Sequence, residues 1–283
     1  MIPRFSQFPA ALASRTQHAR LGPMRVPSLL SHPDWERPTP VVLWMHGRTV
    51  SKELDPGRYL RWLRAGIAAC AVDLPGHGER VDPVLQTPRR TLDVIAQMRA
   101  EIDGVVAALA APEYKGIFDL SRIAIGGMSA GGMVALRRLC DPHPFTCAAV
   151  ECTTGWLEGL YFPAAGMPAA AGRFLEHDPS RVSPLDPMRH VATWRPMPLL
   201  AMHIKADEVV PFATMERFLD ALRARHRHEG ASESMIELAT WDSTGSPQEH
   251  AGFGRHSNDA KNLQTAFLAK HLRAEPVDLD ATA

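Results

Sequence analysis

The sequence predicts an α/β fold, in which a mostly parallel central sheet is flanked by helices on both faces. Apolar runs of strand length alternate along most of the chain with segments of helical periodicity, which is the pattern of such a sheet. The 283 residues are 45% hydrophobic and 22% charged, a composition sufficient for a large buried core. Several polar side chains follow directly after predicted strands, where sheets of this kind bind their ligands.

The expected elements begin after a weakly patterned segment, residues 1–38, that holds at most one or two antiparallel edge strands near 20–26. Strands are predicted at 40–45, 67–72, 122–125, 146–152, 198–204 and 235–241. Helices are predicted at 55–63, 92–109, 129–139, 211–229 and 257–272. The helix at 92–109 is predicted because its apolar residues recur at three- and four-residue spacing.

We expect one domain over residues 1–283, with 1–38 as an N-terminal extension and 154–195 as a short insertion. In the insertion the periodic patterns fail, and large apolar side chains cluster among prolines. Long apolar loops more often cover a binding site than form a plain surface loop. We therefore expect this segment to form a lid above the carboxyl ends of the strands. Trp156 and Phe162 would then form the acyl-side wall of a pocket.

The charge pattern limits the classes of partner. The 31 basic and 31 acidic residues balance, so no overall field attracts nucleic acid or an anionic membrane. No apolar run approaches the ~20 residues of a membrane span, and the N-terminus does not resemble a secretory signal, so a cytoplasmic protein is expected. The four cysteines show neither C-x-x-C nor zinc spacing, so disulfides, metals and cofactors are not expected.

The motif G-x-S-x-G at 127–131 lies between a predicted strand and a predicted helix. A strand that turns sharply into a helix holds its serine in a strained conformation, and the two glycines leave room where a Cβ would clash. The serine Oγ then projects above the sheet, and the helix N-terminus behind it favours a developing negative charge. We therefore predict Ser129 as a nucleophile.

A serine hydroxyl needs a base to take its proton, and the base needs a carboxylate to fix its tautomer. Asp207 follows the strand at 198–204 and is the predicted carboxylate, with Glu208 and Asp186 as alternatives. The backbone N–H groups of Ala130, after the nucleophile, and of Arg48, after an early strand, are predicted to form the oxyanion hole.

Two late histidines compete for the role of base. His256 directly precedes the cap of the closing helix, which would hold it at the rim, whereas His250 lies in a loop that contains glycines. We favour His256, since misplacement of a base by about 1 Å can cost ~10²-fold in rate. His46 and His77 precede the serine and are expected to be structural.

Together these motifs resemble those of the α/β-hydrolases, and in particular small bacterial carboxylesterases and prolyl-oligopeptidase-like serine hydrolases. The similar segments are His46-Gly47, 73–78, 127–131, 205–211 and a late histidine. The resemblance implies a nucleophile at Ser129, an acid at Asp207 and a late histidine as base. The family's usual Gly-His is replaced here by Arg255-His256, with Glu249-His250 as the competitor.

We therefore predict a serine hydrolase that acts on a small-molecule carboxylic ester through an acyl-enzyme, with no nucleic-acid or membrane partner. Peptidases, thioesterases and acyltransferases use the same three residue types, so these activities stay open. A non-catalytic ligand-binding protein on the same fold is the second hypothesis. The sequence predicts neither the natural substrate nor the oligomeric state.

Overall fold

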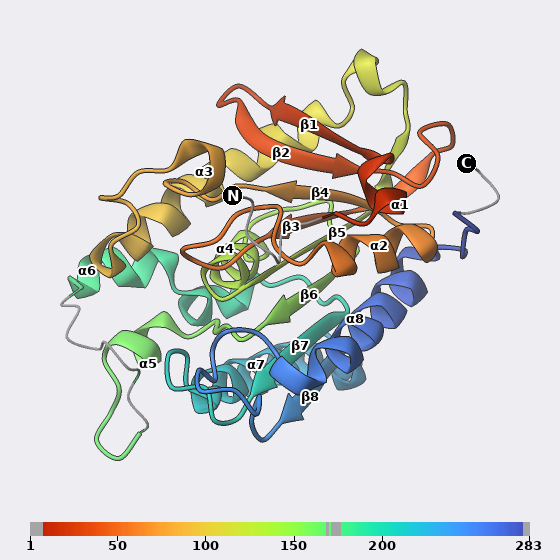
Figure 1. The fold of residues 1–283 in the computed structure, drawn as a ribbon. Helices are drawn as coiled ribbons and strands as arrows, with labels where there is room; N and C mark the ends of the chain where they lie inside the picture. Colours follow the sequence, from red (N-terminus) through yellow and green to blue (C-terminus); the bar gives the residue numbers. More distant parts are fainter. Residues whose placement is uncertain (1–7, 168–169, 171–176, 280–283) are drawn as a thin grey trace.

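One eight-stranded sheet organises the computed structural model, which describes residues 8–167, 170 and 177–279 (Figure 1). The strand order is β1-β2-β4-β3-β5-β6-β7-β8. β1 pairs antiparallel with β2, and β2 with β4, whereas every other neighbouring pair is parallel. The strands are β1 (Thr16–Leu21), β2 (Val26–Ser31), β3 (Thr39–Met45), β4 (Ala68–Val72), β5 (Phe118–Met128), β6 (Cys147–Glu151), β7 (Leu199–Ile204) and β8 (Ile236–Trp241).

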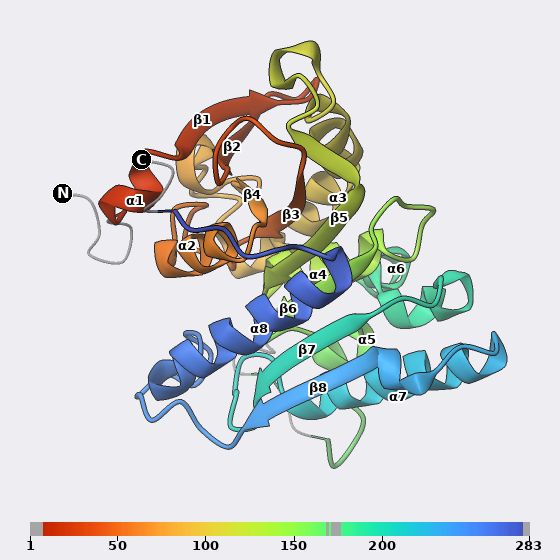
Figure 2. The same cartoon turned by 90° about the vertical axis from the view of Figure 1, so that its right-hand side faces the viewer.

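Helices cover both faces of this sheet (Figure 2). α2 and α8 lie on one face, and α3, α4 and α7 lie on the other. The helices are α1 (Ala10–Ala13), α2 (Pro56–Arg64), α3 (Thr91–Ala108), α4 (Ala130–Arg138), α5 (Leu157–Tyr161), α6 (Pro179–Val182), α7 (Phe212–His228) and α8 (Ser257–Leu272). This is the α/β-hydrolase fold, as predicted.

The central strand β3 shows why the sheet is covered on both faces. Val41, Leu43 and Met45 belong to the core that includes α3, α4 and α7. Val42 and Trp44 belong to the opposite core, with α2 and α8. Successive side chains of a strand point to opposite faces, so a continuously apolar strand such as β3 is stable only between two layers of helices.

The N-terminal edge differs in detail from the expectation of a strand near 20–26. The strands β1 and β2 flank a turn at those residues, in which Gly22 has a φ of 70° and its carbonyl accepts from the Arg25 N–H. A Cβ on Gly22 would lie 2.7 Å from the Gly104 carbonyl carbon. The turn therefore packs closely on α3, a contact that local sequence does not reveal.

The parallel strands bring several loops to one edge of the sheet. Gly47 follows β3, Ser129 follows β5, and Asp207 follows β7, so all three lie near the carboxyl ends. All four cysteines are free and buried. In the described part of the chain no helix is both long and apolar enough to cross a bilayer.

Candidate active site

Ser129 lies at the sharp turn between β5 and α4, with φ 52° and ψ −119°. Such a conformation is strained for any residue with a Cβ and persists only where surrounding contacts hold it. Here the Ser129 N–H donates to the Glu151 carbonyl at 2.9 Å, and the Ser129 carbonyl accepts from Thr153 Oγ1 at 2.7 Å. Both partners lie on β6 or just after it, so the neighbouring strand fixes the serine.

The two glycines of the motif are required by close backbone contacts. A Cβ on Gly127 would lie 2.6 Å from the Met45 carbonyl oxygen, and a Cβ on Gly131 would lie 2.3 Å from the same atom. Neither distance is physically possible without movement of β3. The steric role predicted for these glycines is therefore confirmed.

A chain of hydrogen bonds joins Ser129 to Asp207 through His250. His250 Nε2 lies 2.8 Å from Ser129 Oγ, and His250 Nδ1 lies 2.7 Å from Asp207 Oδ2. The other Asp207 oxygen accepts the N–H groups of Val209 and Val210, both at 2.9 Å. Because a carboxylate can only accept, His250 carries its proton on Nδ1, which leaves Nε2 free to accept the serine proton.

The prediction that His256 faces Ser129 is wrong. The His256 ring stacks on Trp241, and its Nε2 accepts a hydrogen bond from Arg255 Nε at 3.1 Å. The loop between β8 and α8 is closed at its base by a hydrogen bond from the Arg255 N–H to the Thr244 carbonyl. The tip of this closed loop carries His250 to the serine, whereas its base holds His256 against β8.

Neither of the two alternative acids, Asp186 and Glu208, contacts His250 in the described residues. Asp186 is fully buried in the insertion and accepts hydrogen bonds from the N–H groups of Leu157, Glu158 and Met188. It therefore anchors the start of α5. Glu208 is exposed at the edge of the cavity and makes no hydrogen bond to His250 in the described residues.

The predicted oxyanion donors lie beside the serine. A Cβ on Gly47 would come within 3.5 Å of Ser129 Cβ, and both Arg48 and Ala130 line the cavity with Ser129. Among the described residues neither the Arg48 nor the Ala130 N–H has a protein acceptor. Both groups therefore remain available to a ligand, and the prediction of Arg48 and Ala130 stays a prediction.

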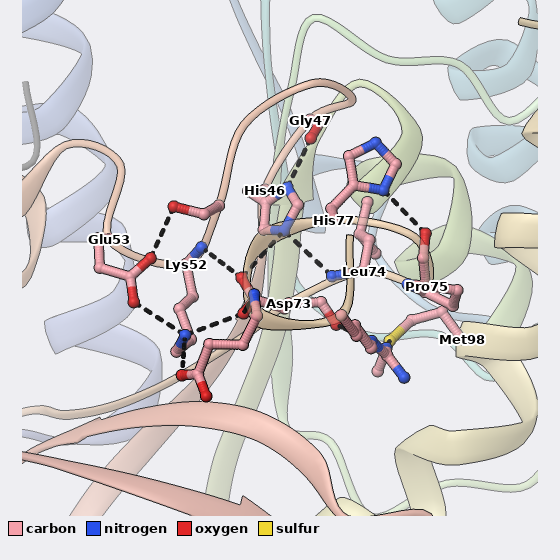
Figure 3. Close-up of polar contacts among 12 residues, drawn as sticks. His46, Gly47, Lys52, Glu53, Asp73, Leu74, Pro75, His77 and Met98 are labelled. Atoms are coloured by element: carbon pink, nitrogen blue, oxygen red, sulfur yellow. Dashed lines mark hydrogen bonds and ion pairs between the residues drawn. The ribbon is translucent and has the colours of Figure 1, made fainter. Parts of the chain in front are cut away.

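His46 controls the direction of the Arg48 N–H. Its Nδ1 donates to the Gly47 carbonyl at 2.5 Å, and its Nε2 accepts the Leu74 N–H at 3.0 Å (Figure 3). The Gly47 carbonyl and the Arg48 N–H belong to one trans peptide and point in opposite directions. Holding the carbonyl therefore also holds the N–H. The sequence predicts a structural role for His46 but gives no sign of this contact.

A buried ion pair ties the same loop to the segment after β4. Lys52 Nζ and the Lys52 N–H both bind the Asp73 carboxylate at 2.9 Å, and the Glu79 N–H adds a third hydrogen bond (Figure 3). Burial alone would raise the pKa of Asp73, but these bonds hold it well below its usual range. His46 Nε2 lies 3.6 Å from Asp73, but it accepts from Leu74, so we attribute the low pKa to Lys52 and the two amides.

A cavity of about 1280 Å³ surrounds Ser129 and His250. The insertion contributes Leu160, Tyr161 and Ala170 to its wall. Trp156 and Phe162, which we expected there, do not line it: a Cβ on Gly159 would lie 2.3 Å from the Trp156 ring, and Phe162 is 41% exposed. Trp156 thus packs on α5, the helix that begins directly after it. Residues 168–169 and 171–176 of the insertion lie outside the described residues.

One cluster in the described part of the chain has metal-ligand character. His18, Glu53 and Glu79 offer atoms within 4.8 Å of one another, and none of the three lines the cavity. Lys52 Nζ already lies 2.8 Å from Glu53 and 2.7 Å from Glu79. A cation at this place would have to displace a buried ammonium group, so the cluster is better explained as an ion-pair network.

The sheet order, the strained serine and the nearby histidine and aspartate define an α/β-hydrolase of the serine type. Comparison with known families then places the chain more narrowly. Residues 60–275 match the prolyl oligopeptidase family. The chain therefore belongs to that family, and it is a hydrolase.

Individual relatives include both esterases and peptidases. The esterase YjfP of Escherichia coli (strain K12) is 28% identical over 210 residues, which span 70% of this chain and 81% of that protein. TT1662 from Thermus thermophilus has a similar structure, with a TM-score of 0.68, 22% identity, and coverage of 92% of this chain and 100% of the other. The puromycin-hydrolysing peptidase of Mycobacterium tuberculosis gives a TM-score of 0.65 at 20% identity, with coverage of 93% and 42%. The last two similarities indicate a shared fold.

Proposed function

We propose that this protein hydrolyses carboxylic esters through an acyl-enzyme on Ser129. The observation that carries the proposal is the hydrogen-bonded chain from Ser129 Oγ through His250 to Asp207. In this arrangement the serine can lose its proton as it attacks, and the resulting imidazolium is stabilised by a buried carboxylate. The similarity to an Escherichia coli esterase over most of its length supports an ester substrate.

In the first half of the reaction, Ser129 Oγ attacks the ester carbonyl carbon while His250 Nε2 takes the hydroxyl proton. The N–H groups of Ala130 and Arg48 bind the developing oxyanion. Collapse of the tetrahedral intermediate breaks the bond to the alcohol, which leaves with the proton from His250. Asp207 holds the His250 ring and its Nδ1 proton in place throughout.

In the second half, water attacks the acyl-enzyme. His250 takes a proton from this water, the oxyanion forms again at the same two N–H groups, and Ser129 leaves with the proton returned by His250. The products are a carboxylic acid and an alcohol, and the enzyme is regenerated.

Peptide hydrolysis is the second candidate, and membership of the prolyl oligopeptidase family favours it. The same residues would act, with an amine in place of the alcohol. Parallel assays of 4-nitrophenyl esters of rising acyl length and of aminoacyl 4-nitroanilides separate the two. We expect a higher kcat/KM for an ester; efficient cleavage of anilides with slow cleavage of every ester would assign the protein as a peptidase.

A further inference from the structure

The side chain of Arg48 enters the same cavity with an unusual set of contacts. Its Nη1 donates to Thr91 Oγ1 at 2.6 Å, and its Nη2 donates to the Gln86 carbonyl. Its Nε is buried and has no hydrogen-bond partner. No carboxylate pairs with Arg48 among the described residues, and burial lowers the pKa of its guanidinium.

Arg48 is half-buried, and three other buried or half-buried arginines have acidic partners. Arg58 pairs with Glu151 at 2.9 Å, Arg80 with Glu101 at 2.8 Å, and Arg138 with Asp103 at 2.6 Å. Removing part of a guanidinium from water without a counter-charge is costly. The buried, unpaired Nε of Arg48, and the lack of a carboxylate beside it in the described part of the chain, therefore call for a functional explanation.

The remaining charges around the cavity are either balanced or solvated. Lys261 pairs with Asp55 at 2.7 Å, and the Arg58–Glu151 pair lies near them. Glu208 is exposed to solvent. Arg48 is thus the cation of the described cavity wall that has no carboxylate partner.

We propose that the Arg48 side chain binds a free carboxylate of the substrate, so that the preferred substrates are esters that also carry an anionic group. This inference rests on the proposed ester hydrolysis and specifies its substrate class. A guanidinium has five N–H donors, two on each terminal nitrogen and one on Nε. Thr91 and Gln86 occupy one on each terminal nitrogen, so one N–H on each remains free to donate to an anionic oxygen.

Two pairs of substrates test the proposal on both sides of the ester bond. On the acyl side, mono-4-nitrophenyl adipate and 4-nitrophenyl hexanoate have the same chain length and differ in the terminal carboxylate. On the alcohol side, 4-acetoxybenzoate and 4-acetoxybenzamide differ in the same way. The readout is the ratio of kcat/KM, anionic over neutral, within each pair. A ratio is insensitive to changes in the oxyanion hole that slow both esters equally.

Three variants accompany the wild-type protein. Arg48→Met removes the charge and keeps the backbone N–H, whereas Arg48→Lys keeps a cation. Arg223→Met is the matched control, because Arg223 lies on α7, pairs with Asp220 and does not line the cavity. Thermal unfolding and fluorophosphonate labelling verify that each variant is folded and that Ser129 is reactive.

We expect the wild type to favour the anionic ester in at least one pair, and Arg48→Met to lower that ratio by roughly 10- to 100-fold. Arg48→Lys should retain most of the preference, and Arg223→Met all of it. Ratios near one in both pairs for the wild type, or a ratio unchanged in Arg48→Met, would overturn the proposal.

A binding measurement separates this proposal from the proposed function. Calorimetric titration of monoethyl adipate into Ser129→Ala and into Ser129→Ala/Arg48→Met needs no turnover. Binding that depends on Arg48 supports the anion site even if no ester is hydrolysed. Failure to bind, or equal binding by both proteins, contradicts the site even if neutral esters are hydrolysed.

Discussion

His250 and His256 lie six residues apart and make different contacts. His250 lies between a hydroxyl and a buried carboxylate, whereas His256 accepts from Arg255 and stacks on Trp241. A general base must lie within hydrogen-bond reach of the proton that it removes. At the scale of the residue, this geometry supports the proposal that His250 is the base.

This assignment predicts opposite behaviour of two alanine variants. His250→Ala should lower kcat for a 4-nitrophenyl ester by about 10³-fold or more, because no other group is placed to take the serine proton. His256→Ala should change kcat by less than about tenfold, since its ring stacks on Trp241 and accepts a hydrogen bond from Arg255 rather than facing Ser129. Steady-state kinetics of the two purified variants provides the test, and the reverse ranking would contradict the hydrogen bonds described above.

The sequence was sufficient to predict where a polar side chain lies when its position depends on a nearby strand end. Ser129 follows β5 directly, and Asp207 lies in the turn three residues after the end of β7, so the strand ends determine where they lie. His250 is not placed by a strand end, because its position depends on the closure of its loop by Thr244 and Arg255 and on Gly254 packing against Thr244, where a Cβ would lie 2.3 Å from the carbonyl oxygen. The spacing of residues in the sequence contains no sign of these contacts.

At the scale of the element, the loop after β3 has a single orientation that two side chains maintain. His46 binds the Gly47 carbonyl, and Lys52 joins the loop to Asp73. His46→Phe keeps a ring in place but removes both hydrogen bonds of the imidazole. We expect kcat to fall by about 10²-fold with little change in KM, because loss of one oxyanion donor costs ~10²–10³-fold. An unchanged kcat in a folded variant would show that His46 does not orient an oxyanion donor.

The insertion gives a second prediction at this scale. Leu160 is buried at the cavity wall, and Phe162 is exposed outside it. Leu160→Ala should change the preference between short and long acyl chains by ~1–3 kcal/mol in kcat/KM, the range expected for about one methylene in an apolar pocket. Phe162→Ala is the matched control and should keep the wild-type profile across a series of 4-nitrophenyl esters. Equal profiles for all three proteins would exclude Leu160 from the acyl site.

Elements with strong periodicity were predictable, and those that depend on distant contacts were not. The buried strands from β3 to β7 follow from continuous apolar runs, which a two-sided core requires. Leu160, Tyr161 and Ala170 of the insertion line the cavity, but the apolar cluster did not indicate which of its side chains would do so. Trp156 packs on Gly159 of the adjacent helix α5, and the direction of its side chain depends on packing that an aperiodic sequence does not specify.

At the scale of the whole molecule, buried ion pairs make stability depend on pH. The pKa of Asp73 is lowered in the folded protein, so below the ordinary aspartate value of ~3.9 the unfolded chain binds a proton more readily than the folded one. The free energy of unfolding should therefore fall as the pH drops below about 5, and continue to fall toward the low folded-state pKa. Urea unfolding at pH 7 and at pH 4 measures this change.

Lys52→Met is the control for the acid dependence. It should lower the free energy of unfolding at pH 7 by ~3–5 kcal/mol, because it leaves the buried Asp73 carboxylate without its cation. The decrease between pH 7 and pH 4 should then be smaller than in the wild type, since the folded-state pKa of Asp73 rises. If the free energy of unfolding of Lys52→Met falls between pH 7 and pH 4 as much as that of the wild type, other carboxylates cause the acid sensitivity.

The proposed mechanism requires Ser129 to carry the acyl group during turnover. The direct measurement is mass spectrometry of peptides from a reaction with a 4-nitrophenyl ester, quenched with acid during steady state. We predict an added acyl mass on the peptide that contains Ser129, and no such mass in Ser129→Ala. An acyl group on a different residue, or hydrolysis by Ser129→Ala at the wild-type rate, would contradict it.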